Sequence, residues 1–278
     1  MGAERPAGIS VTAMIFTLNE AIHLPLCLES LRDLDEVIVI DSFSRDATES
    51  IARAAGARFF QHAFTGFGDQ RNWAIDHTGP RHEWILMLDA DERVTPELAA
   101  ELRRISESAA GDIGAFRLKR RFYFRGRWLK RSSLYPTWVV RLVRKGRVRY
   151  ENRGHAETQT VEGRIGELRS DLIDENLKGG QEWQERQDRY AEREAEYEAA
   201  QAAKPLSPGE IFSADPMVRR AAAKRLAARL AFRAPLYFLY VYIFRMGFLD
   251  GPRGLRFCLM KAGYYASVEA KVREKLRR

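Results

Sequence analysis

The stretch "WILMLDADERV", residues 84–94, decides the fold, because an apolar run leads directly into three acids. An almost uniformly apolar run of this length is typical of a strand that is buried on both faces of a sheet. Asp89, Asp91 and Glu92 follow at its end. Carboxylates are costly to bury and repel one another at close range. The stretch therefore predicts a buried strand that ends at a binding site for a positively charged group.

Similar strands precede this one in the sequence. Residues 9–17 read "ISVTAMIFT" and lead to Asn19, and the apolar run of "DEVIVIDSFS", residues 35–44, ends in Asp41. Helical spacing of apolar residues or capping residues predict helices over 23–34, 47–56, 67–79 and 95–108. The last of these has Thr95 at its N-cap and Pro96 at its first helical position. Alternating strands and helices predict an α/β fold, a mostly parallel sheet with helices on both faces.

Ligands of such sheets bind outside the carboxyl ends of the strands. Asn19, Asp41 and Asp89 all stand at predicted carboxyl ends, so we expect the acids to face a crevice there. We predict "EWILMLDADERV", residues 83–94, to be a single strand. Residues 114–157 alternate aromatic, aliphatic and basic side chains and predict short strands that extend the sheet.

The C-terminal third predicts a helical extension. We expect a long helix over 181–204, a helix over 217–244 that is interrupted or kinked at Pro235, and a final helix over 255–275. The apolar run "APLYFLYVYIF", residues 234–244, is too short to cross a membrane, for which about 20 residues are needed. Its aromatic residues and flanking arginines suit a helix on an anionic membrane surface. A core helix or an oligomer contact is the alternative.

Charge is unevenly distributed along the 278 residues, whose net charge is +8. Basic residues dominate 119–153 and the chain after 217, whereas 181–198 is acidic. Segregated positive charge indicates an anionic partner, which is a nucleic acid, a phosphorylated substrate or an anionic lipid. The two cysteines, Cys27 and Cys258, have no metal or redox spacing and fit a reducing compartment. No signal peptide is recognised, so we expect a cytoplasmic protein.

Asp89-Ala90-Asp91 is a D-x-D triplet, which suits Mg²⁺ or Mn²⁺, since these ions take oxygen ligands from carboxylates and substrate phosphates. Solvated turn acids are the alternative, but the position at a strand end favours the metal. Asp41 could accept hydrogen bonds from a nucleotide base or ribose; the alternative is that it is a cap or turn residue. Arg71 could reach a phosphate from a helix; the alternative is that it is a solvated surface cation. The sequence has neither a phosphate-binding P-loop nor a G-x-G-x-x-G fingerprint.

Four segments resemble the nucleotide-sugar domain of family 2 glycosyltransferases. They are "TLNEAIHLPLCLESL", "DEVIVIDSFSRDATESIARAAGAR", "GFGDQRNWAI" and "WILMLDADERVTPEL". "RFYFRGRWLKRSSLYPTWVVRLVRKGRVRYE" and "FLDGPRGLRFCLMKAGYY" resemble the branch that adds sugars to the lipopolysaccharide inner core, the WaaE/KdtX/LgtF-like beta-glucosyltransferases. The resemblance covers nearly the whole chain. It implies a GT-A fold, a single inverting displacement and usually a divalent metal.

The resemblance also implies a division of the chain. Residues 1–178 would form the GT-A catalytic domain, with a nucleotide-sugar part over about 1–110 and an acceptor part over about 111–178. Residues 179–278 would form the helical extension, which we expect to associate with the membrane. The nucleotide sugar would be bound by seven residues: Thr17, Asn19, Glu20, Asp41, Arg71, Asp89 and Ala90. Asp91 and Asp89 would hold Mg²⁺ or Mn²⁺.

Inverting transfer requires a base that deprotonates the acceptor hydroxyl. The family places a carboxylate after the second group of strands, often in a "HE" pair, and here "NRGHAETQ" separates the pair by Ala156. We expect Glu157 to be the base, with His155 nearby; a strand-surface acid is the alternative for Glu157. Arg125, Arg127, Tyr135 and His155 are the candidates for acceptor binding.

The expected function is transfer of a hexose, most simply glucose, from a UDP-sugar to a lipid-linked or anionic saccharide such as lipopolysaccharide inner core. The expected location is the inner face of the cytoplasmic membrane, with the C-terminal helices on the anionic surface. We expect no nucleic acid partner, and a homo-oligomer is possible. Two alternatives stay open: a nucleotidyltransferase on a related sheet, which releases pyrophosphate, and a non-catalytic basic-aromatic RNA-binding module.

Overall fold

The computed structural model describes residues 8–108, 111–153, 156–202, 207–212, 219, 222 and 232–277. The chain divides into two compact units. The first consists of the chain up to Asn152 together with Glu157–Leu177, and the second consists of Arg153–Ala156 and Lys178–Arg278.

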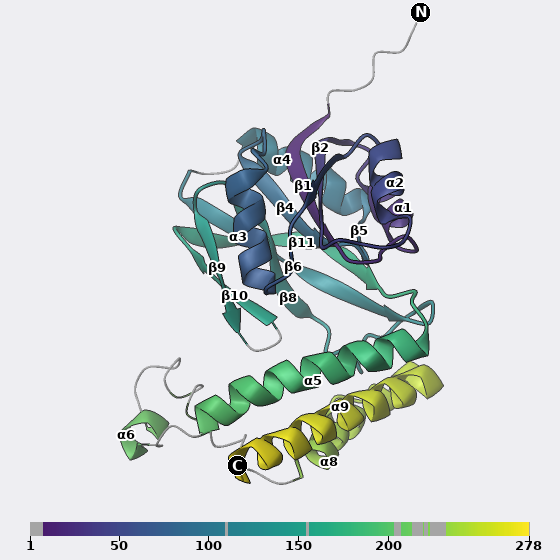
Figure 1. The fold of residues 1–278 in the computed structure, drawn as a ribbon, viewed down its shortest axis with the longest axis vertical. Coiled ribbons are helices and arrows are strands. Elements are labelled where there is room, and N and C mark those ends of the chain that lie inside the picture. The colour runs from purple at the N-terminus through teal and green to yellow at the C-terminus, as the bar shows by residue number, and fades with distance from the viewer. Residues whose placement is uncertain are drawn as a thin grey trace, which may run out of the picture. The chain divides into compact units, whose positions relative to one another are not determined.

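The first unit is built on a nine-stranded sheet, whose main path has the order β3-β2-β1-β4-β8-β6-β11-β5 and in which β7 pairs with β6 (Figure 1). Its strands are β1 Ile9–Thr17, β2 Leu34–Asp41, β3 Arg58–Gln61, β4 Trp84–Asp89, β5 Glu92–Val94, β6 Ile113–Phe124, β7 Arg127–Trp128, β8 Thr137–Arg144 and β11 Arg164–Glu175. Strands β3, β2, β1 and β4 are parallel, and β8 is antiparallel to both β4 and β6. A separate pair is formed by β9 Val148–Arg153 and β10 Ala156–Val161.

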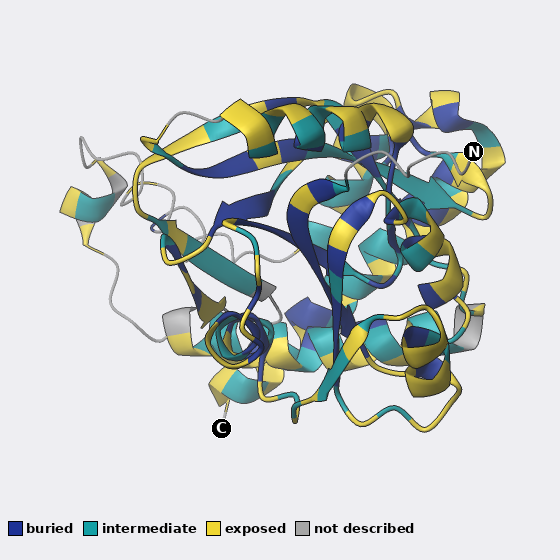
Figure 2. Cartoon of the chain, turned by 90° about the horizontal axis from the view of Figure 1, so that it is seen from above, coloured by how far each residue is buried: buried dark blue, intermediate teal, exposed yellow. Residues whose placement is uncertain are grey.

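Helices cover both faces of this sheet, as the alternation of the sequence predicted. The described part of this unit contains the helices α1 Leu24–Ser30, α2 Thr48–Ala54, α3 Phe67–His77 and α4 Pro96–Ser108. Because successive side chains of a strand point to opposite faces, Val11, Ala13 and Ile15 of β1 pack with α1, α2 and α4. Met14 and Phe16 pack on the other face with α3 and β9. The expected GT-A type of α/β fold is confirmed, and Figure 2 shows its strands as mostly buried.

The single strand predicted over residues 83–94 is wrong. Strand β4 ends at Asp89, the chain turns at Ala90 and Asp91, and β5 pairs antiparallel with β11 on the other side of β6 and β8. The reason is the insertion of β8 and β6 between β4 and β11, so that the acidic turn crosses the strand ends. Thr95 caps α4 as predicted, since its hydroxyl accepts the Leu98 N–H at 3.2 Å.

The second unit is helical. In the described residues its elements are α5 Gly180–Ala202, α6 Pro208–Ile211, α8 Arg233–Phe238, the π-helical turn η1 Leu239–Phe244, the 3₁₀ turn η2 Gly247–Asp250 and α9 Gly251–Arg277. Of the helix predicted over 217–244, residues 217–218, 220–221 and 223–231 lie outside the described residues. Pro235 falls in the first turn of α8, where its missing N–H costs no intrahelical hydrogen bond.

Helices α5 and α9 pack against each other through small and β-branched side chains. Ala191 and Ala195 of α5 form a buried cluster with Val268 and Val272 of α9. Ion pairs flank this contact, with Lys271 Nζ 2.6 Å and Lys275 Nζ 2.7 Å from the carboxylate of Glu192. Among the described residues, no helix combines the length and the apolar composition that a membrane crossing needs.

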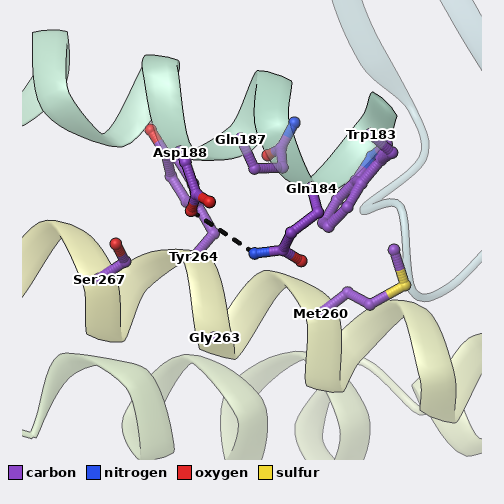
Figure 3. Close-up of a pocket in the computed structure, with 8 residues that line it drawn as sticks. All are labelled: Trp183, Gln184, Gln187, Asp188, Met260, Gly263, Tyr264 and Ser267. Carbon is purple, nitrogen blue, oxygen red and sulfur yellow. Dashed lines mark hydrogen bonds between the residues drawn. The ribbon is translucent and has the colours of Figure 1, made fainter. Parts of the chain in front are cut away.

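A cavity of about 170 Å³ lies between α5 and α9 within this unit (Figure 3). Gln184 Nε2 donates to Asp188 Oδ1 along its wall at 3.5 Å, the limit of a hydrogen bond. The other lining residues are Trp183, Gln187, Met260, Gly263, Tyr264 and Ser267. None of the acids at the strand ends is among them.

Candidate active site

The end of β4 brings Asp89 to the face of the sheet that α3 covers. Ile85 and Met87 pack on that face, and Asp89 follows them at the same spacing of two residues. Arg71 of α3 donates from Nη2 to Asp89 Oδ1 at 3.1 Å and from Nε to Glu157 Oε1 at 3.1 Å. One guanidinium thus joins the first acid of the D-x-D triplet to the acid predicted as the base.

The Arg71 guanidinium is buried against two aromatic rings. Its central carbon lies 4.7 Å from the ring centroid of Phe16 and 5.8 Å from that of Tyr150. The third nitrogen of this guanidinium, Nη1, is buried and has no hydrogen-bond partner among the described residues. The same is true of the hydroxyl oxygen of Tyr150. Buried donors without partners are rare because each costs the free energy of lost hydration. Both atoms therefore suit an oxygen-rich ligand at this site.

Helix α3 is fixed to β9 by hydrogen bonds to the backbone. Asn72 Nδ2 donates to the Tyr150 carbonyl at 2.8 Å, and the Tyr150 N–H donates to Asn72 Oδ1 at 3.0 Å. Gly68 packs so closely on β9 that a Cβ would lie 2.9 Å from the carbonyl carbon of Glu151. This part of "GFGDQRNWA" therefore sets the position of Arg71 and Tyr150.

A second arginine, Arg141 of β8, holds the other side of the acidic turn. Its Nη2 lies 2.7 Å from Asp89 Oδ2 and 2.7 Å from Glu92 Oε1, and its side chain is 7% exposed. Arg120 continues the pattern, with Nη1 3.0 Å from Asp174 Oδ2 and 3.9 Å from Glu92. We call these three arginines and the four acids that they contact the strand-end cluster. Its members are Arg71, Arg120, Arg141, Asp89, Glu92, Glu157 and Asp174.

The arginines divide the acids of this cluster by their pKa. Partial burial opposes ionisation of Asp89, but Arg141 and Arg71 hold its pKa well below the usual range. Burial raises the pKa of Glu92 to about 7, although Arg141 opposes the shift. Burial likewise raises the pKa of Asp174 to about 6, against the opposing charge of Arg120. At neutral pH the cluster therefore keeps Asp89 charged while its neighbours titrate close to neutrality.

Asp91 differs from Asp89 in its contacts. Asp91 Oδ2 accepts from Asn176 Nδ2 at 3.3 Å, and Asp91 forms no ion pair with any described residue. Both oxygens of Asp89 are taken by arginines. No three His, Cys, Asp or Glu side chains among the described residues converge as a metal centre. A Mg²⁺ or Mn²⁺ ion shared with substrate phosphates needs only one or two protein carboxylates, and Asp91, which has no ion pair among the described residues, fits this role.

The residues predicted to line the nucleotide pocket stand together at the ends of β1 and β2. Asp41 is buried, accepting from Thr17 Oγ1 at 2.9 Å and from the Ser44 N–H at 2.8 Å. Asn19 is exposed with a left-handed φ of 55°, and its Oδ1 accepts the Arg45 N–H at 2.8 Å. These contacts order the loop beside the strand ends. Ala90 is buried in the turn after Asp89.

Glu20 is turned toward a histidine that the sequence did not single out. His23 is buried, and its Nε2 accepts the Leu177 N–H at 2.7 Å, so the ring proton lies on Nδ1 and is donated to Glu20 Oε2 at 2.5 Å. The pair ties the loop after β1 to the end of β11.

The residues predicted to bind the acceptor are not brought together by described contacts. Arg125 and Gly126 form the two-residue turn between β6 and β7 with φ values of 52° and 73°, and Arg127 is exposed beside them. Tyr135 donates from its hydroxyl to Asp171 Oδ2 at 3.1 Å. His155 lies outside the described residues.

Arg141, Glu92, Arg120 and Asp174 were missed as site residues. A signal for Arg141 was available, because "TWVVRLVRK" places it between apolar residues in the middle of a strand, where an unpaired charge is not tolerated. Glu92 was seen among the three acids, but its partner was not.

A mostly parallel α/β sheet with paired acids after its central strand is the arrangement expected of a nucleotide-sugar domain. The chain belongs to glycosyl transferase family 2, whose family profile matches residues 12–169. The lipopolysaccharide core biosynthesis glycosyltransferase LpsC of Rhizobium meliloti (strain 1021) is 29% identical over 168 residues, which is 58% of this chain and 61% of that protein.

An uncharacterized glycosyltransferase of Rickettsia bellii (strain RML369-C) is 37% identical over 103 residues, or 37% of this chain and 34% of that protein. The chain thus spans less than two thirds of either relative. Among solved structures, S. aureus TarS 1–349 has a TM-score of 0.43 and 14% identity, and the match covers 96% of this chain and 90% of that one.

Proposed function

We propose that this chain transfers a hexose from a UDP-sugar, with inversion, to a lipid-linked saccharide such as lipopolysaccharide inner core at the inner face of the cytoplasmic membrane. The observation that carries the proposal is the bridge from Asp89 through Arg71 to Glu157. It puts a strand-end acid and a candidate base around one buried cation. Family membership and the similarity to LpsC support the reaction and the acceptor class.

Donor binding follows from the groups around Arg71. The unpartnered Nη1 of Arg71 and the hydroxyl of Tyr150 supply donors to diphosphate oxygens. Asp89, kept ionised by Arg71 and Arg141, accepts from ribose hydroxyls. Thr17, Asn19, Glu20, Asp41 and Ala90 shape the nucleotide pocket. Asp91 would hold Mg²⁺ or Mn²⁺, which when bound neutralises charge on the diphosphate leaving group.

Glu157 acts on the acceptor. Its Oε1 is held by Arg71, and among the described residues its Oε2 has no hydrogen-bond partner, so Oε2 takes the proton of the acceptor hydroxyl. The acceptor oxygen then bonds to the anomeric carbon while the bond from that carbon to the phosphate oxygen breaks, and UDP leaves. A single displacement of this kind inverts the configuration.

The test is a thermal-shift screen of UDP-sugars with and without Mn²⁺, using the wild type and Asp91→Asn. A ligand that binds only the folded state raises its melting temperature. We expect one UDP-sugar to stabilise the wild type with Mn²⁺, and the gain to disappear in Asp91→Asn. Asp112→Asn is the matched control, because Asp112 is an exposed acid paired with Arg164 outside the cluster.

Product analysis separates the alternatives. Glycosyl transfer releases UDP, whereas a nucleotidyltransferase releases pyrophosphate. An RNA-binding module binds nucleic acid with an affinity that falls steeply with salt and is unaffected by Asp91→Asn. Indifference of the wild type to every nucleotide sugar contradicts the proposal.

A further inference from the structure

The turns that precede α9 carry an unusually apolar exposed surface. We call it the apolar patch, and it consists of Leu236, Leu239, Tyr240, Ile243, Phe244 and Phe248. Five of its members recur at spacings of three and four residues along α8 and η1, which places them on one stripe of the helical turns. Phe248 is the exposed member from η2, and its ring meets that of Tyr242 of η1 edge-on with centroids 6.3 Å apart.

The patch is exposed far beyond what scattered surface residues explain. Phe244 is 77% exposed, and the other members are each about half exposed. Soluble surfaces seldom gather large apolar side chains in one place unless something binds there. The π-helical turn itself is supported from beneath, since Val241 is buried and Phe238 stacks on Tyr242.

The exposed charged residues between residues 234 and 268 all have the same sign. Asp250 is the only acid between residues 232 and 268, and it is buried. Arg245, Arg253 and Arg256 are exposed, and none of them forms an ion pair with another residue in the described part of the chain. An exposed apolar stripe that is followed along the chain by exposed arginines fits a partner with an apolar interior and an anionic surface.

We infer that the apolar patch docks the chain on an anionic lipid bilayer, with the aromatic residues at the headgroup level and the three arginines on lipid phosphates. The inference rests on the proposed function, in which the acceptor is lipid-linked. A symmetric pair of two copies through the patch is disfavoured, because it would bring the same arginines of both copies together. Each arginine near an anionic surface adds about fivefold to binding.

The test is co-sedimentation of the full chain with vesicles that contain neither donor nor saccharide, so the outcome does not depend on catalysis. Vesicles of phosphatidylcholine alone are compared with vesicles that also contain phosphatidylglycerol. We expect binding to the anionic vesicles that weakens with salt. Ile243→Ser/Phe244→Ser should reduce it at least tenfold, and Arg253→Gln/Arg256→Gln by more than tenfold.

Leu26→Ser on α1 and Arg32→Gln in the turn after α1 are matched controls at exposed residues, and these variants should bind like the wild type. Circular dichroism confirms that each variant is folded. Absence of wild-type binding to either vesicle, or variants that bind as the wild type does, overturns the inference. So does light scattering that shows a dimer dispersed by Ile243→Ser/Phe244→Ser without any vesicle binding.

Discussion

Arg71 donates to Glu157 and to Asp89 from adjacent nitrogens of one guanidinium, each at 3.1 Å. The three residues come from α3, β10 and the end of β4, so they meet only in the folded chain. Lysine offers one charged nitrogen and cannot reproduce this fork. The relative positions of Asp89, at the proposed donor site, and of Glu157, the proposed base, therefore depend on the single buried side chain of Arg71.

Arg71→Lys should therefore lower kcat/KM for sugar transfer by about 100-fold, the scale of one lost donor to a developing charge. The reason is that lysine keeps the charge but cannot hold Asp89 and Glu157 together. Steady-state kinetics measures the effect, with the melting temperature as the check of folding. Arg32→Lys, an exposed change in the turn after α1, should leave the rate unaltered. Wild-type kinetics in Arg71→Lys would show that the bridge has no part in transfer.

Arg141→Met should destabilise the fold by about 3–5 kcal/mol, because it leaves Asp89 and Glu92 without their buried partner. Urea denaturation gives the free energy of unfolding. Adding Glu92→Gln to this variant removes one of the two carboxyl groups that lose Arg141, so the double variant should be more stable than Arg141→Met alone. Additive effects of the two changes would mean that the residues do not interact.

Asn72→Ala should cost about 2 kcal/mol, because it removes two hydrogen bonds to the backbone of Tyr150 and leaves those groups without partners. Donor affinity should fall with it, since α3 carries Arg71. Asp76→Ala, on an exposed part of the same helix, is the control. Equal losses of stability and donor affinity in both variants would show that Asn72 does not fix α3 to β9.

Stability at low pH should depend on Glu36, which is buried at the opposite end of the sheet. Burial alone would raise its pKa, but hydrogen bonds from Thr12, the Arg81 backbone and Arg58 outweigh this and lower the pKa from 4.5. A carboxyl whose pKa is lower in the folded state stabilises the fold above its unfolded pKa and loses that contribution as pH falls.

Glu36→Gln should thus cost about 2 kcal/mol at pH 7, and its deficit should shrink as the pH falls below 4.5. Urea unfolding of both proteins between neutral and acidic pH measures this difference. Parallel pH profiles would show that Glu36 does not titrate with folding.

Local pattern was sufficient for several elements in the N-terminal part of the first unit. Continuous apolar runs gave β1, β2 and β4, and the Thr95-Pro96 pair marked the start of α4. The position of Asn19, Asp41 and Asp89 at one edge follows from parallel strands. What local pattern did not reveal is the break at Ala90 and Asp91, because the pairing of β5 with β11 is a long-range contact.

The partners of the acids could not be predicted from local pattern either, because they are also long-range contacts. Asp89 was expected to meet a metal, whereas two arginines from α3 and β8 take both of its oxygens. Arg71 was proposed for the donor, but its link to Glu157 spans 86 residues of sequence. Such contacts depend on topology, which spacing along the chain does not encode.

The central claim is that Glu157 is the base of an inverting transfer, and Glu157→Gln tests it most directly. Glutamine is nearly isosteric but cannot accept the acceptor proton. The account predicts that this variant binds its UDP-sugar with wild-type affinity by calorimetry while its single-turnover transfer falls about 100-fold or more. It also predicts that the wild-type product has the opposite anomeric configuration to the donor. Wild-type transfer by Glu157→Gln, or a product that retains the donor configuration, would contradict the account.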